Sequence, residues 1–481
     1  MELQLPPSQK PNLIGGHFRK FRKDPTGFLT EQAKLGDVTF FRMGSQPGYF
    51  LNHPDLVRDL FVVSAHKFMK GRALQRAKKL LGEGLLTSEG DFHLRQRRMI
   101  QPAFHRARID EYARSMVKFA DRMSSTWTDG EVRDIDKDMM HLTLQIVGKT
   151  LFSANVEDDA DAVGKAMTTV SKLFDFLLVP YSEWLQYLPL PQSRSFNHAR
   201  DTLNKVIYGI INERRRSGEN TGDLLSMLLS ARDEGDGGTM TDEQVRDEAL
   251  TLFLAGHETT ANALTFTWYL LSLNPDKAQK LYEELDVVLG RNPTGADTGR
   301  NPTGREGASI GRNRTGMEGA SVNPESKIQN PKSGDVPNLK YTEAVLAESM
   351  RLFPPAWAIG RLAMHEHEFG GYKIPKGALI LVSPYIAGRD PRYWDDPDKF
   401  IPERWQQLSV KEAGQKYIYF PFGGGIRRCI GEGFAWTEGI LLLATLAQKW
   451  KLTLAPGQKL GLQPMITLRP KYGMKMRVER R

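Results

Sequence analysis

The sequence predicts a mainly α-helical protein with a smaller β portion, and three observations support this. Apolar residues recur at helical spacing from about residue 55 to residue 289. Strand and turn patterns occupy residues 371–384 and 451–479, nearer the C-terminus. A further strand is expected at residues 38–43, with residues 48–52 as its hairpin partner. The β residues are therefore divided between the two ends of the chain.

Composition narrows the class of protein. The chain has 481 residues, of which 40% are hydrophobic and 26% are charged, as in ordinary globular proteins. A core of this size can enclose a flat cofactor. The net charge of +9 suits an acidic partner or a membrane surface, or simply a solvated basic surface. We expect a monomer without a nucleic-acid partner.

The single cysteine excludes a disulfide within the chain and is compatible with a reducing compartment. The first residues show no charged segment followed by an apolar run, so no signal peptide is expected. The stretch of about 20 apolar residues that a membrane anchor requires is also missing there. We therefore expect a cytoplasmic protein with no transmembrane anchor.

Residues 291–335 differ from the rest of the chain, which we interpret as a single domain over residues 1–481. The pentapeptide RNPTG begins at Arg291 and again at Arg300, and REGAS at Arg305 is echoed by MEGAS at Met317. Twelve of these 45 residues are Gly or Pro, and no helical or strand period is visible. The composition predicts a disordered, repeat-containing surface insertion.

A long helix is predicted between Thr241 and Leu273. Thr241 and Gln244 form a capping-box pattern, and Asn274-Pro275 ends the helical pattern. Such a helix measures about 48 Å and can cross a whole domain. Its apolar middle is interrupted by the polar hexapeptide 255–260. A buried helix that carries such a cluster is a candidate for a functional site.

Each residue of the hexapeptide has a possible chemical use. Ala255 and Gly256 lack bulk, so a ligand could lie against the backbone. The hydroxyl of Thr259 and the carboxylate of Glu258 could pass protons to a buried reacting group. Alternatively, the glycine serves packing and the polar side chains bond back to helix carbonyls. His257 is interpreted as such a satisfied residue rather than a metal ligand.

The second candidate site is the loop that carries the cysteine, residues 422–431. Its three consecutive glycines permit a tight turn and close approach to a flat group. Arg427 lies two residues before Cys429, and the apolar stretch 434–446 reads as a helix that begins nearby. A helix dipole, backbone amides and a cation all favour a thiolate, which is an axial ligand of haem iron. The alternative is an inert buried cysteine.

The loop Phe422–Gly431 resembles the haem-binding signature of the cytochrome P-450 family at every defining position. Residues 255–260 resemble the oxygen-activation motif of the family, and Glu348 with Arg351 resembles its Glu-x-x-Arg motif. The resemblance covers nearly the whole chain outside residues 291–335. It implies the cytochrome P-450 fold, with haem b between the long helix and the cysteine loop and Cys429 as the iron ligand.

The resemblance also assigns residues around the haem and in the scaffold. Glu348 and Arg351 can pair at i, i+3, and with Arg404 they resemble the buried structural triad of the family. His93 stands where many members have Trp, although some soluble bacterial members have His, and a surface position is the alternative. The remaining residues implied for cofactor binding are Arg97, Arg361 and Arg427, which match groups that hold the haem carboxylates, together with Phe422, Gly425, Gly431, Ala255 and Gly256.

The implied activity is that of a haem-thiolate monooxygenase, with Thr259 and Glu258 as the catalytic proton relay. No dinucleotide fingerprint or flavin-binding region follows the haem segment, so a ferredoxin or flavodoxin with its reductase is expected to supply electrons. A set of arginines could attract such an acidic partner, namely Arg95, Arg98, Arg106, Arg108, Arg427 and Arg428. The alternatives are an H2O2-dependent peroxygenase, which the Glu258-Thr259 pair disfavours, and a haem-based sensor or carrier.

Two apolar segments bear on the substrate. Ala356, Trp357, Ala358 and Ile359 resemble the strand that lines the pocket of the family, and residues 174–190 would fall near the access channel. Both favour a lipophilic small molecule, with a terpenoid or a fatty acid as the leading classes. Plain core packing is the alternative for each segment.

We predict that residues 293–333 can be deleted without loss of folding or catalysis. Loop-closure entropy rises slowly with length, so the free energy of unfolding should change by only about 1 kcal/mol. The variant should bind haem fully and turn over as before, and limited proteolysis should cut the intact chain first in this segment. Loss of haem incorporation would show that the segment belongs to the fold. Loss of turnover with one redox partner alone would make it a docking element.

Overall fold

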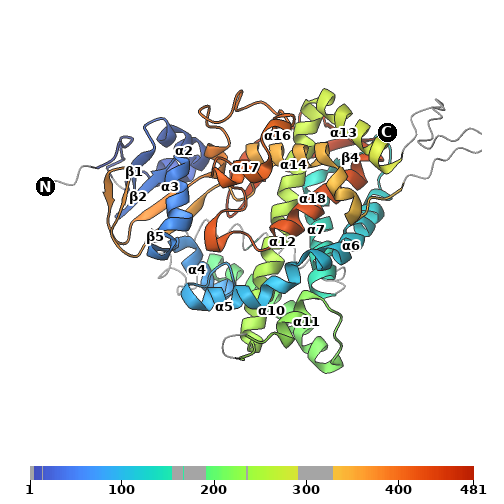
Figure 1. Cartoon of the computed structure of the whole chain (residues 1–481), viewed down its shortest axis with the longest axis horizontal. Coiled ribbons are helices and arrows are strands. Elements are labelled where there is room, and N and C mark those ends of the chain that lie inside the picture. Colours follow the sequence, from blue (N-terminus) through green and yellow to red (C-terminus); the bar gives the residue numbers. More distant parts are fainter. Residues whose placement is uncertain are drawn as a thin grey trace, which may run out of the picture.

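The structure is a computed structural model that describes residues 5–13, 15–153, 166, 169, 191–233, 237–290 and 329–481. Most of the predicted insertion at 291–335, and the whole aromatic segment 174–190, lie outside the described residues. The rest of the chain is mainly helical with a smaller β portion, as predicted. The strands of the largest sheet lie at one side of the molecule, and most helices lie in the middle and on the other side, together with a smaller sheet (Figure 1).

The largest sheet has the strand order β1-β2-β8-β5-β3. β1 (Val38–Met43) and β2 (Gln46–Leu51) form the predicted hairpin, closed by a two-residue turn in which Gly44 has a φ of 63°. β8 (Leu379–Val382) runs parallel to β2, and β5 (Ile359–Ala363) lies antiparallel to β8. β3 (Phe68–Lys70) was not predicted, because it lies inside the stretch of helical spacing.

The smaller sheets use the C-terminal strands. The order β4-β12-β9 joins β4 (Val132–Asp134) to β12 (Lys475–Arg480) and β9 (Trp450–Leu454). A hairpin pairs β10 (Leu462–Pro464) with β11 (Leu468–Pro470), and another pairs β6 (His367–Phe369) with β7 (Tyr372–Ile374). The prediction of strands at 371–384 and 451–479 is therefore confirmed.

The described helices occupy most of the remaining chain. Their bounds are α1 (Phe18–Lys23), α2 (Pro25–Ala33), α3 (Pro54–Arg58), α4 (Arg72–Leu81), α5 (Gly90–Ile100), α6 (Arg106–Ser124), α7 (Ile135–Phe152), α10 (Pro191–Ser217), α11 (Leu224–Ser230), α12 (Asp242–Leu273), α13 (Pro275–Leu289), α14 (Lys340–Leu352), α15 (Pro384–Ala387), α16 (Arg404–Gln407), α17 (Val410–Gln415) and α18 (Glu432–Ala447). Among the described residues, no helix is both long enough and apolar enough to cross a bilayer.

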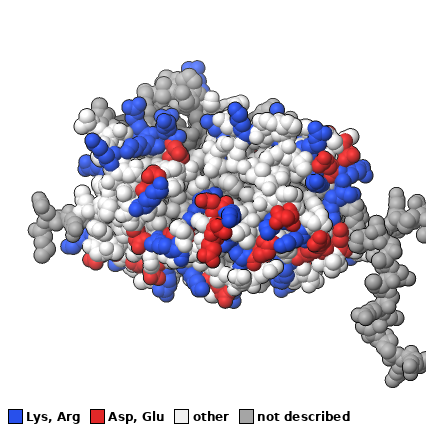
Figure 2. Space-filling view, turned by 90° about the horizontal axis from the view of Figure 1, so that it is seen from above, with Lys and Arg blue, Asp and Glu red and all other residues white. Residues whose placement is uncertain are grey.

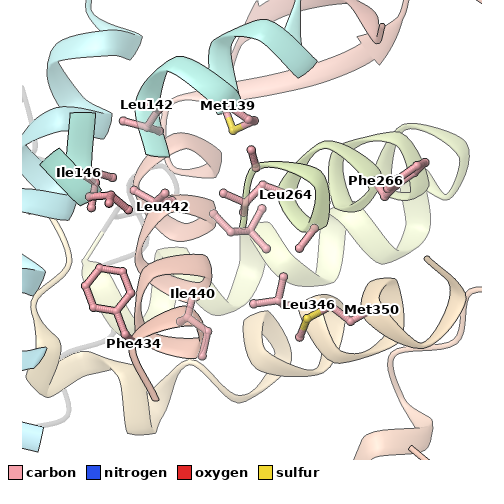
Figure 3. Close-up of a cluster of buried hydrophobic side chains, with 14 of the residues drawn as sticks. Met139, Leu142, Ile146, Leu264, Phe266, Leu346, Met350, Phe434, Ile440 and Leu442 are labelled. Atoms are coloured by element: carbon pink, nitrogen blue, oxygen red, sulfur yellow. The ribbon is translucent and has the colours of Figure 1, made fainter. Parts of the chain in front are cut away.

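The long helix α12 runs through the middle of the molecule (Figure 1). Its capping box is formed by Thr241 and Gln244, and its 32 residues end at Leu273, before Pro275. Apolar side chains pack it against α7, α14 and α18 (Figure 3): Met139, Leu142, Ile146, Leu264, Phe266, Leu346, Met350, Phe434, Ile440 and Leu442. The close approach of α18 to α14 requires Gly439, because a Cβ there would lie 2.6 Å from a methyl carbon of Leu346.

A buried ion-pair network fixes α14 to α16. Arg351 binds the carboxylate of Glu348 through two hydrogen bonds of 2.9 and 2.8 Å. Arg404 donates to the same carboxylate at 2.9 Å, and Trp405 Nε1 donates at 3.0 Å. Glu348 and Arg351 have fully buried side chains. The predicted association of Glu348, Arg351 and Arg404 is therefore present, together with an indole that the sequence did not indicate.

We predict that Glu348→Gln lowers the free energy of unfolding by about 3–5 kcal/mol, because it leaves the buried Arg351 guanidinium without a counter-charge. Urea denaturation followed by circular dichroism would measure the change. The matched control is Glu31→Gln, which removes an exposed pair with Lys34 and should change stability by less than about 1 kcal/mol. Equal effects of the two substitutions would contradict a structural role for the network.

Candidate active site

The cysteine loop is closed by a backbone hydrogen bond from Cys429 N–H to the carbonyl of Phe422, at 2.9 Å. Gly425 has a φ of 63°, and a Cβ at this position would lie 1.8 Å from the carbonyl oxygen of Phe61. The positive φ and the backbone of Phe61 thus account for glycine at 425. Phe422 packs on Trp436 of α18, with ring centroids 5.8 Å apart.

The thiol of Cys429 is accessible, although protein atoms surround it densely. Burial raises its pKa to about 11, which outweighs a hydrogen bond from the backbone N–H of Gly431 and the charges of Arg97 and Arg428. The prediction that Arg427 stabilises the thiolate is wrong, because Arg427 forms an ion pair with Glu89 and donates to the carbonyl of Ser88. At this pKa the thiol is neutral near pH 7, and a bound metal cation would favour the thiolate.

The middle of α12 has accessible residues although most of the helix is buried. Ala255 is exposed, and Thr259 is partly accessible between the buried Glu258 and Thr260. Thr259 Oγ1 donates to the carbonyl of Ala255 at 2.7 Å, and His257 Nδ1 hydrogen-bonds with the carbonyl of Phe253 at 3.2 Å. The interpretation of His257 as a satisfied polar residue is therefore confirmed. The hydroxyl oxygen of Thr259 keeps lone pairs that can still accept a hydrogen bond.

Gly256 serves helix packing. A Cβ at this position would lie 3.0 Å from a methyl carbon of Val147 on α7. The two helices are also tied by Thr143 of α7, whose hydroxyl donates to the carbonyl of His257 at 2.8 Å. Gly256 is therefore explained by packing between the two helices, whereas Ala255 provides the accessible surface of the hexapeptide.

Glu258 lies in an ion pair. Arg469 of β11 donates from Nε to one carboxylate oxygen at 2.7 Å and reaches the other from Nη2 at 2.6 Å. Thr467 adds a hydrogen bond from its hydroxyl. Burial raises the pKa of Glu258, but the hydrogen bonds and charge of Arg469 outweigh burial and hold the pKa below its usual value. In this arrangement Glu258 is a charged acceptor with no proton to give.

Three basic side chains converge on the opposite side of the site. Lys70 of β3 and Arg361 of β5 are directly paired across the sheet, although like charges in that position repel. Burial, followed by the charge of Arg427, lowers the pKa of Lys70 to about 7 and that of Arg361 to about 10. Glu89 is the main negative charge that balances these three cations. An excess of buried cations fits a bound group that carries carboxylates.

His93 belongs to the same cluster. Its ring is buried, its Nδ1 lies 3.2 Å from Ser88 Oγ, and its Nε2 has no hydrogen-bond partner within the described residues. The alternative of a surface histidine is therefore wrong. Burial and nearby Lys70 lower its pKa to about 3, so His93 is neutral and can contribute a hydrogen bond but no charge. An unpartnered ring nitrogen beside three cations also fits a carboxylate ligand.

The structure separates the residues assigned to the cofactor into two groups. Arg361 and Arg427 lie in the cationic cluster. Arg97 lies between the two groups: its charge acts on both His93 and the sulfur, and it donates to the carbonyl of Arg428 at 2.8 Å. The sequence missed Lys70 and Arg469. A lone lysine in a three-residue strand gives no signal until its cross-strand partner is known. Arg469 interrupts an apolar strand pattern, and that was a usable signal.

The four residues proposed to line the substrate pocket differ in burial. Trp357 is buried, and its Nε1 donates to the carbonyl of Met465 at 3.0 Å, so core packing describes it best. Ala356, Ala358 and Ile359 are partly accessible. They are the members of this segment that can contact a ligand.

The arginines predicted to form a basic docking face are mostly paired. Arg95 and Arg98 both lie within 3.3 Å of Asp233, and Arg108 lies 2.9 Å from Glu111. Arg427 pairs with Glu89, and Arg428 with Glu432. These pairs offset part of the charge that the arginines could offer an acidic partner. The upper face shown in Figure 2, which lies away from α5 in Figure 1, carries interspersed basic and acidic side chains, apart from a mainly basic group at the upper left.

Comparison with known proteins identifies the chemistry that these features serve. The family model described as Cytochrome P450 matches residues 6–301 and 321–476. The chain is 36% identical to cyclooctatin synthase of Streptomyces melanosporofaciens, over 95% of this chain and 91% of that protein. It is 33% identical to cyclooctat-9-en-7-ol 5-monooxygenase of the same species, over 92% and 89% of the two chains. Identity to pentalenene oxygenase of Streptomyces avermitilis is 32%, over 92% and 90%.

We predict that Cys429→Ser removes the thiolate signature from the absorption spectrum of the reduced carbon monoxide complex. The only cysteine lies at the accessible position in the loop, so no other side chain can supply a thiolate. The control is Ser88→Ala, which alters the cationic side of the site and should keep the red-shifted Soret band. A Cys429→Ser protein that retains that band would exclude Cys429 as the ligand.

Proposed function

The chain belongs to the cytochrome P450 family, and we propose that its substrate is a terpenoid. It is a haem-thiolate monooxygenase, an enzyme that incorporates one atom of O2 into a lipophilic compound and takes electrons from redox partners. The observation that carries the substrate proposal is the likeness, along about nine-tenths of each chain, to three bacterial proteins. Two of them are named for oxidation of cyclooctat-9-en-7-ol and pentalenene.

The cofactor proposed for the site is haem b. When bound, haem supplies the reductive activation of O2, and a thiolate ligand favours cleavage of the O–O bond. Cys429 would bind the iron from the loop that precedes α18. Arg97, Arg361 and Arg427, together with Lys70, would bind the two carboxylates, whose charge offsets the repulsion between Lys70 and Arg361. The neutral His93 would donate a hydrogen bond.

Thr259 and Glu258 are proposed to deliver the protons that the reaction consumes. The oxygen of the accessible Thr259 hydroxyl can accept a hydrogen bond from a proton donor, and the hydroxyl can release its own proton to another acceptor. Glu258, the next residue on α12, would bring protons from the protein interior to this hydroxyl. Ala255 supplies the accessible, unobstructed surface one turn earlier on the same helix.

The remaining proposals concern the surroundings of the enzyme. Ala356, Ala358 and Ile359 form a partly accessible apolar surface that suits a hydrocarbon skeleton. A ferredoxin or flavodoxin with its reductase would supply the electrons. The described residues hold no membrane-spanning helix, and we propose a cytoplasmic monomer.

The substrate class can be tested with the purified ferric protein. We expect cyclic sesquiterpenes and diterpene alcohols to shift the Soret band, and fatty acids of equal carbon number to shift it less. A bound terpenoid should be oxidised with NAD(P)H, a ferredoxin and its reductase. A shift and turnover with fatty acids alone would overturn the terpenoid proposal. Turnover with H2O2 alone would identify a peroxygenase, and turnover in neither assay would favour a sensor or carrier.

A further inference from the structure

The helix α1 presents its cations to solvent. It has the sequence FRKFRK, and none of its residues is buried. Phe18 and Phe21 lie three positions apart and share one side of the helix, which leaves the four basic residues on the other sides. Residues 5–23 contain five Lys or Arg and no Asp or Glu. α1 is therefore the centre of a strongly basic stretch of the surface.

Hydrogen bonds fix this basic helix to the largest sheet. His17, directly before α1, is buried, and its Nδ1 accepts a hydrogen bond of 3.0 Å from the backbone N–H of Arg42 on β1. Because Nδ1 is the acceptor, Nε2 carries the ring proton and donates it to the carbonyl of Gln9 at 2.8 Å. The backbone N–H of His17 donates to the carbonyl of Arg42 at 2.7 Å. The cations of α1 are thus held beside Arg42, which is exposed as well.

We call the exposed cations of this region the N-terminal basic face: Lys10, Arg19, Lys20, Arg22, Lys23 and Arg42. Within the described part of the chain, none of these side chains has a carboxylate oxygen within 4.0 Å. The next acid along the sequence, Asp24, caps α2 by accepting from the N–H of Gly27 at 2.9 Å. In Figure 2 the mainly basic group lies at the end of the molecule where Figure 1 places the N-terminus. Unbalanced charge of one sign attracts an anionic surface.

Exposed leucines accompany these cations. Leu13 is completely exposed, in a turn that the backbone N–H of Asn12 closes on the carbonyl of Gly16 at 3.0 Å. Leu5 and Leu35 are exposed on the flanking segments. Apolar side chains flanked by cations suit the boundary between the acyl chains and the anionic headgroups of a bilayer. A nucleic acid would bind the cations and leave the leucines in water.

The basic face adjoins the segment proposed to contact the substrate. The ring centroid of Phe21 lies 6.4 Å from that of Trp357 and 5.7 Å from that of Phe28. Trp357 is followed by Ala358 and Ile359, which are partly accessible. A lipophilic compound is more concentrated in a bilayer than in water. A bilayer on this face would therefore bring the substrate close to the residues that receive it.

We propose that the N-terminal basic face docks the enzyme on the surface of a bilayer that contains anionic lipids, with Leu13 inserted among the headgroups. The negative surface attracts the cations, and insertion of the leucine removes apolar area from water. A lipophilic substrate then enters from the bilayer beside Phe21 and Trp357. The docking is independent of the substrate class, and only this entry step rests on the proposed function.

Co-sedimentation of the holoenzyme with lipid vesicles tests the docking. We expect the protein to pellet with vesicles of phosphatidylcholine and phosphatidylglycerol, to stay in solution with vesicles of phosphatidylcholine alone, and to be released as salt is raised. Arg22→Gln/Lys23→Gln should weaken binding by about tenfold or more, because each cation near the surface contributes to the attraction. Leu13→Ser should weaken binding by about tenfold and leave its dependence on salt unchanged.

The matched control is Lys475→Gln/Arg477→Gln, which removes one Lys and one Arg from exposed positions of β12. β12 pairs with β4, at the opposite end of the molecule from the N-terminus (Figure 1). This variant should bind the vesicles as the wild type does. Equal losses in the two double variants, or a wild type that does not pellet, would overturn the proposal. If no vesicle binds and Arg22→Gln/Lys23→Gln slows reduction by an acidic ferredoxin, the face docks a protein and the bilayer proposal is wrong.

The entry step is measured with a lipophilic compound that shifts the Soret band, supplied either in buffer or dissolved in the anionic vesicles. We expect the shift from vesicles to be about tenfold slower in Arg22→Gln/Lys23→Gln than in the wild type, and the shift from buffer to be equally fast in both. Equal rates from vesicles would overturn entry from the bilayer, whereas sedimentation decides the docking. If no lipophilic compound shifts the band, the proposed substrate class is wrong and the docking result is unaffected.

Discussion

The carboxylate of Glu348 is completely buried, and such a charge is tolerable only when every lone pair finds a donor. It receives two bonds from Arg351 and one each from Arg404, Trp405 and the backbone of Ile401. The donors other than Arg351 all lie on residues 401–405, so the carboxylate fixes α14 relative to α16 and to the chain that leads into it. α14 in turn packs against α18 at Gly439. The cysteine loop immediately precedes α18, and its position therefore depends on this buried charge.

The active site shows the opposite principle, because its charges are left incompletely balanced. Lys70, Arg361 and Arg427 share mainly Glu89 as their counter-charge. An excess of cations is stable when an anionic cofactor completes it. The balanced network at Glu348 supplies the rigid frame in which such imbalances persist.

Local patterns were enough to predict much of this architecture. The capping box at Thr241, the stop at Pro275 and the β1–β2 hairpin depend on neighbours in sequence, and they lie where the sequence placed them. The partnership of Glu348 and Arg351 follows from helical spacing. β3 was missed because three residues carry no period of their own, and its identity depends on pairing with β5. Lys70 became part of the site only through that pairing.

The chemistry of individual side chains was harder to predict than their positions. Arg427 lies two residues from Cys429 but pairs with Glu89, and His93, which the sequence assigns to the cofactor, is uncharged. In both cases residue type and spacing were known, and burial and a distant partner decided the outcome. Glu258 shows the same effect most sharply: the sequence places an acid beside Thr259, and only the folded chain reveals the arginine that keeps it ionised. Protonation states depend on the tertiary structure, because desolvation and charge pairing arise only after distant segments of the chain have come together.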